Sequence, residues 1–273
     1  MITAEIVADS INTSSRNKRI TSFILTYPRF IHAELMTHRM FSRNAASSRA
    51  IPISKFIEDV LTDPAVPSHW GANQKGMQAD NEVDDATKVK ALLIWNSARD
   101  SMVQHAKQLN ELGIHKQIAN RLMEPFFHIK TLLTATEYSN FFKLRAHSAA
   151  QPEIRELAYK MQDAMKASSP KELKNGDWHI PFGDRFTDGL SIEQKLKIAT
   201  ARAARVSYKT FDGIINYDRD YTLHDQLLKE GHFSPLEHSA QATFGVHANF
   251  CQWIQYRTIM ENVNRQEPCS HLQ

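Results

Sequence analysis

The chain has 273 residues, of which 42% are hydrophobic and 23% are charged, and this composition excludes disordered, collagen-like and fibrous proteins. The formal net charge of +3 and the pI near 8.8 are mildly basic, which suits phosphorylated small molecules as well as nucleic acid. There is no long apolar run of membrane type and no signal-peptide pattern, and Cys251 and Cys269 are the two cysteines. We therefore expect a cytoplasmic protein with no membrane association, no disulfide framework and no four-thiolate zinc site.

The first predicted elements are a strand and a helix. Residues 20–27 (ITSFILTY) are β-branched and aromatic and stop at Pro28, which is typical of a strand that leads into a turn. Residues 30–52 predict a helix, because their apolar side chains can share one side before the period is lost among the serines. This interpretation places His38 and Arg39 near the end of a helix.

The remaining elements follow from periodicity and from turn residues. They are a long loop at 61–83, a helix at 92–112, helices at 152–165, 191–206 and 221–230, a strand at 239–246 and a helix at 248–257. Residues 168–191 are rich in proline, glycine and aspartate and form the best candidate boundary. We expect one domain over residues 1–273, with a loop-rich segment around 168–191.

The densest group of chemically useful side chains lies at residues 37–52 (THRMFSRNAASSRAIP). It contains His38, Arg39, Ser42, Arg43, Asn44, Ser47, Ser48 and Arg49. Guanidinium groups bind phosphate through paired hydrogen bonds, and hydroxyls or loop N–H groups can complete such a site. The alternative is a solvated polar helix end. The interleaving of arginines with small hydroxyl residues favours anion binding.

This segment resembles the signature of the flavin-dependent thymidylate synthases, which is Arg-His-Arg, seven residues, then Ser, followed shortly by Arg. His38 and Arg39 stand at the second and third signature positions. Ser47 stands at the signature serine and Arg49 at the arginine after it. The preceding PRFIHAEL is similar to the helix that leads into the motif.

Two further blocks resemble the same family. The segment 113–154 contains GIHKQIANRLMEP, YSNFFKLRAHS and AQPEI, with Arg121, Asn140 and Arg145 at functional positions. The third block, ARVSY at 204–208 and GHFSPLEH at 231–238, is similar to segments that line the flavin. That block comes first in ordinary members and last here, so the chain is identified as a divergent and circularly permuted member. Permutation is tolerated when the natural termini lie close together.

The resemblance implies a role for each matching residue. Flavin contacts are implied for His38, Arg39, Asn140, Ser207, Ser234 and Glu237. Nucleotide contacts are implied for Glu34, Ser47, Ser48, Arg49, Arg121 and Arg145. Arg145 is the implied catalytic residue, because a guanidinium that faces a pyrimidine carbonyl stabilises the negative charge that develops as C5 becomes nucleophilic.

The sequence departs from the family at several positions. Thr37 replaces an arginine used at the flavin, Ala45 replaces a glutamate, and Thr134 and Thr136 occupy the neighbourhood of another flavin-binding Asn and Arg. Glu34 stands where members have a glutamine on the nucleotide side. An ionised glutamate only accepts hydrogen bonds, whereas glutamine also donates, so this replacement can move the base preference from uracil toward cytosine.

The resemblance implies an α+β fold with a mainly antiparallel sheet and long helices, and a homotetramer with interfacial active sites. The implied reaction is transfer of a one-carbon unit from methylenetetrahydrofolate to C5 of a pyrimidine deoxynucleoside monophosphate, most simply dUMP to dTMP. FAD is the implied cofactor, with NADPH as reductant if the product is methylated. The alternatives are a dUMP or dCMP hydroxymethylase, or a dCMP methylase, of the same fold.

Two alternatives to an enzyme site of this family are a zinc site and a nucleic-acid-binding surface. His232, Glu237 and His238 are possible zinc ligands, but they lack the His-Glu-x-x-His spacing and we expect no metal site. A nucleic-acid-binding module is suggested by the basic segment 14–19 (SSRNKR), although acidic residues are interspersed through most of the chain. Each arginine of the pair Arg121 and Arg145 could also serve only a surface salt bridge.

Overall fold

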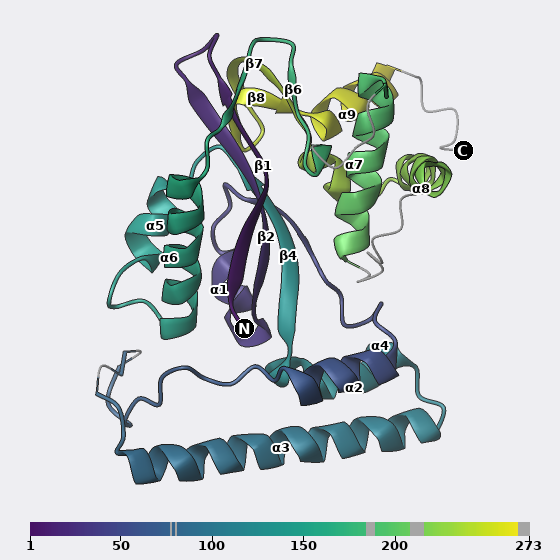
Figure 1. Cartoon of the computed structure of the whole chain (residues 1–273). Helices are drawn as coiled ribbons and strands as arrows, with labels where there is room; N and C mark the ends of the chain where they lie inside the picture. Colours follow the sequence, from purple (N-terminus) through teal and green to yellow (C-terminus); the bar gives the residue numbers. More distant parts are fainter. Residues whose placement is uncertain (77, 80, 184–188, 208–215, 267–273) are drawn as a thin grey trace.

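The computed structural model describes residues 1–76, 78–79, 81–183, 189–207 and 216–266, with side chains described up to residue 263. Cys269 and Tyr208, the last residue of the ARVSY segment, lie outside these ranges. Figure 1 shows an extended body with one long helix across its base and the carboxyl-terminal elements at the opposite end.

The strands and helices alternate irregularly along the chain. The strands are β1 (Thr3–Asn12), β2 (Lys18–Pro28), β3 (Ser42–Ala45), β4 (His128–Ala135), β5 (Lys171–Leu173), β6 (Trp178–His179), β7 (Ala240–His247) and β8 (Phe250–Gln255). The α-helices are α1 (His32–Met36), α2 (Ile53–Thr62), α3 (Asp85–Glu111), α4 (Lys116–Ala119), α5 (Ser139–Arg145), α6 (Pro152–Ala167), α7 (Ile192–Val206), α8 (Tyr217–Lys229) and α9 (Tyr256–Gln266). Short 3-10 helices are η1 (Arg29–Ile31), η2 (Asn120–Phe126) and η4 (Ser234–Glu237).

The larger sheet has the strand order β3-β4-β2-β1-β5. Within it, β1 pairs with β2, β2 with β4 and β4 with β3 in antiparallel register, and β5 joins β1 in parallel. The smaller sheet, β6-β7-β8, is antiparallel. The expected α+β fold with a mainly antiparallel sheet and long helices is therefore confirmed.

The two faces of the larger sheet are covered by different helices. Alternate residues of a strand point to opposite faces, and Phe23 and Leu25 of β2 are fully buried in one apolar core together with Leu157 of α6. On the other face, Leu132 of β4 packs in a cluster with Val206 of α7. Figure 1 shows α5 and α6 on one side of β1, β2 and β4, with α7 on the other.

The predicted helix over residues 30–52 is wrong beyond its first turn and a half. Helix α1 ends at Met36, and residues 42–45 form strand β3 instead. The apolar pattern is satisfied by one short turn, because Ile31 and Leu35 are the residues that it buries. Beyond this turn, the backbone N–H and C=O groups of residues 42–45 are satisfied by the antiparallel ladder with β4, in which Ser42 is paired with Thr134.

The predicted helix over residues 248–257 is also wrong. This segment contains β8, and only its last two residues start α9. Burial of Phe250, Trp253 and Gln255 against β7 and the sheet fixes an extended conformation that the local sequence does not specify. Trp253 is fully buried, so its interpretation as a core residue and not a base-stacking platform is confirmed.

Other predicted elements agree with the structure apart from their ends. Strand β2 covers the predicted strand at 20–27, β7 covers most of the one at 239–246, and α6 matches the helix at 152–165. Helix α7 starts after Ser191, which makes a complete capping box with Gln194. Helix α3 is longer than predicted and starts at Asp85, where the Asp84 carboxylate accepts from the Thr87 N–H.

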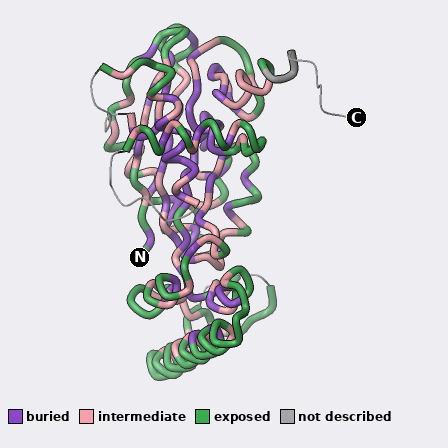
Figure 2. Tube along the Cα trace, turned by 90° about the vertical axis from the view of Figure 1, so that its right-hand side faces the viewer, coloured by how far each residue is buried: buried purple, intermediate pink, exposed green. Residues whose placement is uncertain are grey.

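Helix α3 lies across the base of the molecule beside α2 and α4 (Figure 1). Figure 2 shows that most of its surface is exposed. Only Val103 and Ala106 of its residues are buried. No helix within the residues that the structure describes is both long and apolar enough to cross a membrane.

Candidate active site

The structure brings His38 and Arg145 into direct contact. The Nε–H of Arg145, the last residue of α5, donates a 3.0 Å hydrogen bond to Nε2 of His38, which follows α1. The His38 side chain is held between aromatic rings, with its ring centre 4.9 Å from that of Phe141. Its exposure is 8%, and burial, then Arg145 and Arg43, lower its pKa below the usual value. His38 is therefore neutral at physiological pH.

Glu34 lies next to this pair and has an unsatisfied oxygen. Its Oε2 atom is buried and has no hydrogen-bond partner among the described residues. Burial raises the pKa of Glu34, the charge of Arg145 opposes this rise, and Glu153 adds to it. Buried polar atoms usually have partners, so an orphan carboxylate oxygen beside Arg145 indicates a place where a ligand can donate a hydrogen bond.

Arg43, on β3, lies among the predicted cofactor residues. Its Nη1 donates to the carbonyl oxygens of Met36 at 3.0 Å and His38 at 3.3 Å. Burial lowers the pKa of Arg43, the charge of Glu237 opposes that shift, and the charge of Arg39 adds to it. Arg43 therefore bonds to the turn after α1 and feels the charge of Glu237 on η4.

Ser47 contacts the third block of the family resemblance through its backbone. Its N–H donates a 2.9 Å hydrogen bond to the carbonyl of Ser207, at the end of α7. The preceding N–H, of Ala46, donates to the carbonyl of Lys130 on β4. The segment after β3 is thus held between the larger sheet and α7.

The neighbouring Ser48 is fixed by η2. Its hydroxyl donates a 2.5 Å hydrogen bond to Glu124, whose carboxylate also lies 3.9 Å from the guanidinium of Arg121. The buried Asn120 side chain donates to the carbonyls of Ser48 and Ile51 at 2.7 and 3.0 Å. Ser48 and Arg121 therefore belong to one polar cluster, and Arg121 does make the surface ion pair that was the alternative to a substrate contact.

Several predicted residues are exposed and make no side-chain hydrogen bond or ion pair within the described ranges. These are Arg39, Arg49, Asn140 and Ser234. Glu237 differs, because it accepts a 2.7 Å hydrogen bond from Arg257 of α9. In one chain the structure gathers two separate groups, Glu34 with His38 and Arg145, and Ser48 with Arg121.

The proposed metal ligands do not converge. His232 is exposed and lies 3.4 Å from Glu230, while His238 is buried and its Nδ1 is 2.9 Å from the hydroxyl of Thr134. Among the residues described, no group of three or more His, Cys, Asp or Glu side chains could hold a metal ion. His238 therefore packs and hydrogen-bonds in the interior, as its alternative interpretation expected.

Thr134 and Thr136, two positions where the sequence departs from the family, face the carboxyl-terminal elements. The Thr134 hydroxyl contacts both Ser22, at 2.6 Å, and His238. Thr136 accepts a 3.0 Å hydrogen bond from the backbone of Cys251 on β8. Both hydroxyls are thereby committed to internal contacts.

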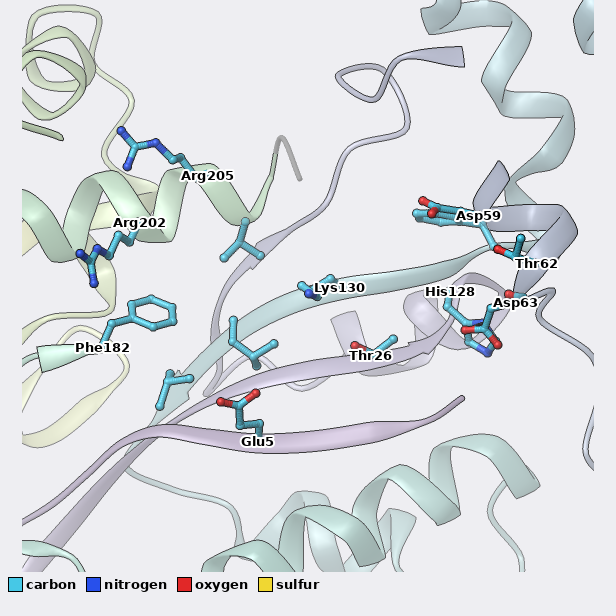
Figure 3. Close-up of a pocket in the computed structure, with 14 residues that line it drawn as sticks. Glu5, Thr26, Asp59, Thr62, Asp63, His128, Lys130, Phe182, Arg202 and Arg205 are labelled. Carbon is cyan, nitrogen blue, oxygen red and sulfur yellow. Dashed lines mark hydrogen bonds and ion pairs between the residues drawn. The ribbon is translucent and has the colours of Figure 1, made fainter. Parts of the chain in front are cut away.

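A separate cavity of about 340 Å³ lies on the second face of the larger sheet, between α2 and α7. Figure 3 shows Arg202 and Arg205 at one end, Asp59 and Asp63 at the other, and Lys130 on the strand between them. Arg205 is already paired with the buried Asp220. None of the site residues predicted from the sequence lines this cavity.

The sequence patterns place Arg43 in the candidate anion-binding segment, and Glu124 and Glu153 in the blocks that resemble the family, but they assign a role to none of the three. Arg43 stands in the polar segment 37–52, but its position on an edge strand could not be read from a helical interpretation. Glu124 stands three positions after Arg121, and Glu153 stands in the AQPEI segment, so their place in the resembling blocks is the signal that could have indicated them.

Comparison with known proteins identifies the family of the chain. Residues 14–171, more than half of the chain, match the family model described as thymidylate synthase complementing protein. The chain therefore belongs to this family. The matched segment contains the signature residues after α1 and the segment of α5, whereas α7 and η4 lie beyond it.

Two relatives with assigned names match a little over half of the chain. A flavin-dependent thymidylate synthase of Thermosipho africanus is 27% identical over 158 residues, which are 55% of this chain and 65% of that protein. One of Thermosipho melanesiensis is 30% identical over 154 residues, with the same shares. The chain thus spans slightly less than two thirds of the length of these relatives.

Among solved structures, a UMP/dUMP methylase PolB from Streptomyces cacaoi bound with 5-Br dUMP superposes with a TM-score of 0.49 and 18% identity. The superposition covers 60% of this chain and 90% of that one.

Proposed function

We propose that this protein is a flavin- and folate-dependent enzyme that transfers a one-carbon unit to C5 of a pyrimidine deoxynucleoside monophosphate, with dUMP to dTMP as the first candidate reaction. The observation that carries the proposal is the contact of Arg145 with His38 beside the orphan oxygen of Glu34. These three residues come from two separate sequence motifs of one family. The names of the Thermosipho relatives support the same reaction class.

The side chains assigned to FAD fit it in part. The flavin ring and the diphosphate present mainly hydrogen-bond acceptors, and His38, Arg39 and Asn140 supply donors that no other side chain within the described ranges engages. Glu237 fits less well within one chain, because its carboxylate is paired with Arg257. The flavin, when bound, supplies the redox chemistry that the side chains of this protein lack.

The protein's own residues would bind and polarise the nucleotide. Ser47 and Arg49 offer a hydroxyl and a guanidinium for a 5′-phosphate. Ser48 and Arg121 lie at Glu124, so Ser48 would donate to the phosphate only after its hydrogen bond to Glu124 is released. The remaining guanidinium N–H groups of Arg145 would face a base carbonyl and stabilise negative charge on the ring. Methylenetetrahydrofolate is the proposed one-carbon donor, and NADPH the proposed reductant if the product is methylated.

A complete site requires more than one copy of the chain in this proposal. The proposed phosphate-binding group on the segment after β3 and the group around Arg145 share no hydrogen bond or ion pair among the described residues. A homotetramer with interfacial sites would bring one group of each kind together. We place this assembly in the cytoplasm, in keeping with its proposed small-molecule substrates.

The carboxyl-terminal third supports the proposed circular permutation. The carbonyl of Ser207 accepts from Ser47, and η4 places Glu237 near Arg43. The hydrogen bond and the charge interaction both relate the third block of the resemblance to the signature segment, although the block comes last in the chain. No comparable contact among the described residues supports a nucleic-acid-binding module, and none is proposed.

A cytosine substrate, or a hydroxymethylated product, is the second candidate. Glu34 favours it, because cytosine presents an amino donor where uracil presents a carbonyl acceptor, and an ionised carboxylate can only accept. A neutral Glu34 can also donate, so the preference depends on the protonation of this group.

The test is product analysis with purified protein, FAD, methylenetetrahydrofolate and a reductant, using dUMP and dCMP in separate reactions. Mass spectrometry of the nucleotide distinguishes a methyl from a hydroxymethyl group at C5. A one-carbon product that requires both FAD and the folate supports the proposal. Absence of product with either base, from folded protein with saturating FAD, would contradict it.

A further inference from the structure

We propose that Arg43 is a positioning residue that acts through His38 on Arg145. Arg43 holds the turn that carries His38, and His38, as the neutral tautomer with its proton on Nδ1, holds the Arg145 guanidinium in one orientation. This inference rests on the proposed function only in giving Arg145 a substrate to face. Its structural content, the state of His38, is testable without any substrate.

The tautomer of His38 follows from the chemistry of its partner. Arginine has only N–H donors and does not lose its proton in proteins. The Nε of Arg145 lies 3.0 Å from Nε2 of His38, so Nε2 must carry the lone pair. A neutral imidazole then has its proton on Nδ1. That Nδ1–H has no hydrogen-bond partner within the described ranges and remains available to a ligand.

Arg43 fixes the backbone on which this hydrogen bond depends. Its Nη1 reaches the carbonyl oxygens on both sides of Thr37, those of Met36 and His38. Arg43 itself is held in the sheet, because β3 pairs it with Leu133 of β4. The turn after α1 is thereby anchored to a rigid strand by a side chain, and the imidazole of His38 is set opposite α5.

The charges around His38 favour the same state. Guanidinium groups face it from two elements, Arg145 from α5 and Arg43 from β3, while its other neighbours are the rings of Phe41 and Phe141. Two carboxylates act on these guanidiniums, Glu34 on Arg145 and Glu237 on Arg43. A proton on Nε2 would remove the acceptor and add a third positive charge, so burial and both arginines keep the pKa of His38 low.

The consequence concerns Arg145. With Nε engaged by His38, its terminal N–H groups point away from that bond in the fixed plane of the guanidinium. Loss of the Arg43 charge would make His38 easier to protonate, and a protonated His38 would release Arg145. Arg43 therefore extends the pH range over which Arg145 stays oriented.

The first experiment uses the wild-type full-length protein. Nitrogen-15 NMR of labelled histidines reports the tautomer and the pKa of each ring, and a His38→Gln variant assigns the His38 signals. We expect a neutral His38 with its proton on Nδ1 and a pKa below the ordinary histidine value. A proton on Nε2, or an ordinary pKa, would overturn the proposal directly.

The second experiment compares Arg43→Gln with Arg43→Lys, and with Arg99→Gln as a control on α3, where Arg99 bonds only to Asn96 and Asp100 among the described residues. We expect Arg43→Gln to raise the His38 pKa, Arg43→Lys to keep most of the depression, and Arg99→Gln to change nothing. An unchanged His38 pKa in a folded Arg43→Gln protein would also refute the proposal.

The pH dependence of kcat provides a separate test. If the enzyme turns over, the acidic limb of kcat should move to higher pH in Arg43→Gln, and each unit of movement costs about tenfold in rate below the limb. The limb of Arg43→Lys should stay near that of the wild type. If the protein binds neither flavin nor nucleotide, the proposed function fails while the NMR result on His38 still decides the role of Arg43.

Discussion

The backbone N–H of Ser47 donates a 2.9 Å hydrogen bond to the carbonyl of Ser207, which lies 160 positions later in a part of the chain beyond the family match. This bond ties the signature serine to the end of α7. The Ser47 hydroxyl takes no part in it and has no partner in the described part of the chain. The backbone of Ser47 is therefore structural, and its side chain is available for a ligand.

Ser47→Ala should weaken nucleotide binding and leave stability unchanged. The variant keeps the backbone bond to Ser207 and loses only a hydroxyl that would contact the phosphate, which is worth about 1 kcal/mol or roughly fivefold in Kd. Calorimetric titration with dUMP and dCMP measures the affinity. Equal Kd values for variant and wild type would remove Ser47 from the phosphate site.

Asn120→Ala is the matched contrast for Ser47→Ala. Asn120 is fully buried and its amide donates to the carbonyls of Ser48 and Ile51, so its removal leaves two buried acceptors without a donor. We expect a loss of about 1–3 kcal/mol in the free energy of unfolding, measured in urea. A stability loss in Ser47→Ala as large as this one would contradict the separation of backbone and side-chain roles.

Arg145→Ala should abolish most turnover while the protein stays folded. Removal of one preorganised donor at a developing charge costs about 10²–10³ in kcat. Arg145 makes no ion pair within the described residues, so the melting temperature should change little. The assay is product formation at saturating nucleotide, with Arg99→Ala on α3 as control. Near-normal turnover would remove Arg145 from the mechanism.

Glu34→Gln should move base preference toward dUMP. Glutamine supplies an N–H donor for the uracil carbonyl that an ionised carboxylate lacks, and one such contact is worth about tenfold in relative kcat/KM. The measurement is the ratio of kcat/KM for dUMP and dCMP in both proteins. An unchanged ratio would show that Glu34 does not contact the base.

Stability should fall as the solution becomes acidic, because several histidines are buried in the neutral form, among them His179 and His238. Burial lowers the pKa of His179 and of His238 to about 3, below the ordinary value of 6.5. The unfolded chain binds protons first, so their contribution is complete above about pH 6.5 and is lost as the pH falls toward 3.

Each of these histidines adds up to about 1.4 kcal/mol per pH unit to the slope of stability in that window. Urea unfolding followed by tryptophan fluorescence at about pH 7.5 and about pH 5 measures it. His179→Gln should reduce the slope, since it removes one of the groups that take up a proton on unfolding. A stability that does not change over this range would mean that the histidines are charged or exposed in the folded protein.

The helices with strong local signals could be predicted from the sequence. The Ser191 capping box with Gln194 and the apolar face of residues 152–165 are local features, and α7 and α6 form where they indicate. In contrast, β3 depends on a partner far away in the chain, and β8 depends on burial against β7. Ser42 pairs with Thr134, and Ala242 with Trp253 in a hairpin whose register is shifted by a bulge.

The site was predictable in residue type and less so in geometry. The motif resemblance named both His38 and Arg145, and the structure places them in contact. It could not indicate Arg43, because that role depends on an edge strand where a helix was expected. The hydrogen bond from Arg257 to Glu237 could not be predicted either, because the helix expected at 248–257 is a strand and Arg257 lies at the start of α9.

The central claim is that this altered site still binds a flavin beside a pyrimidine nucleotide. The most direct measurement is the visible absorption spectrum of the purified protein with added FAD, before and after titration with dUMP and, separately, with dCMP. We predict a bound-flavin spectrum that one of the two nucleotides perturbs, and that nucleotide identifies the base. A spectrum that remains that of free FAD under all these conditions would contradict the account.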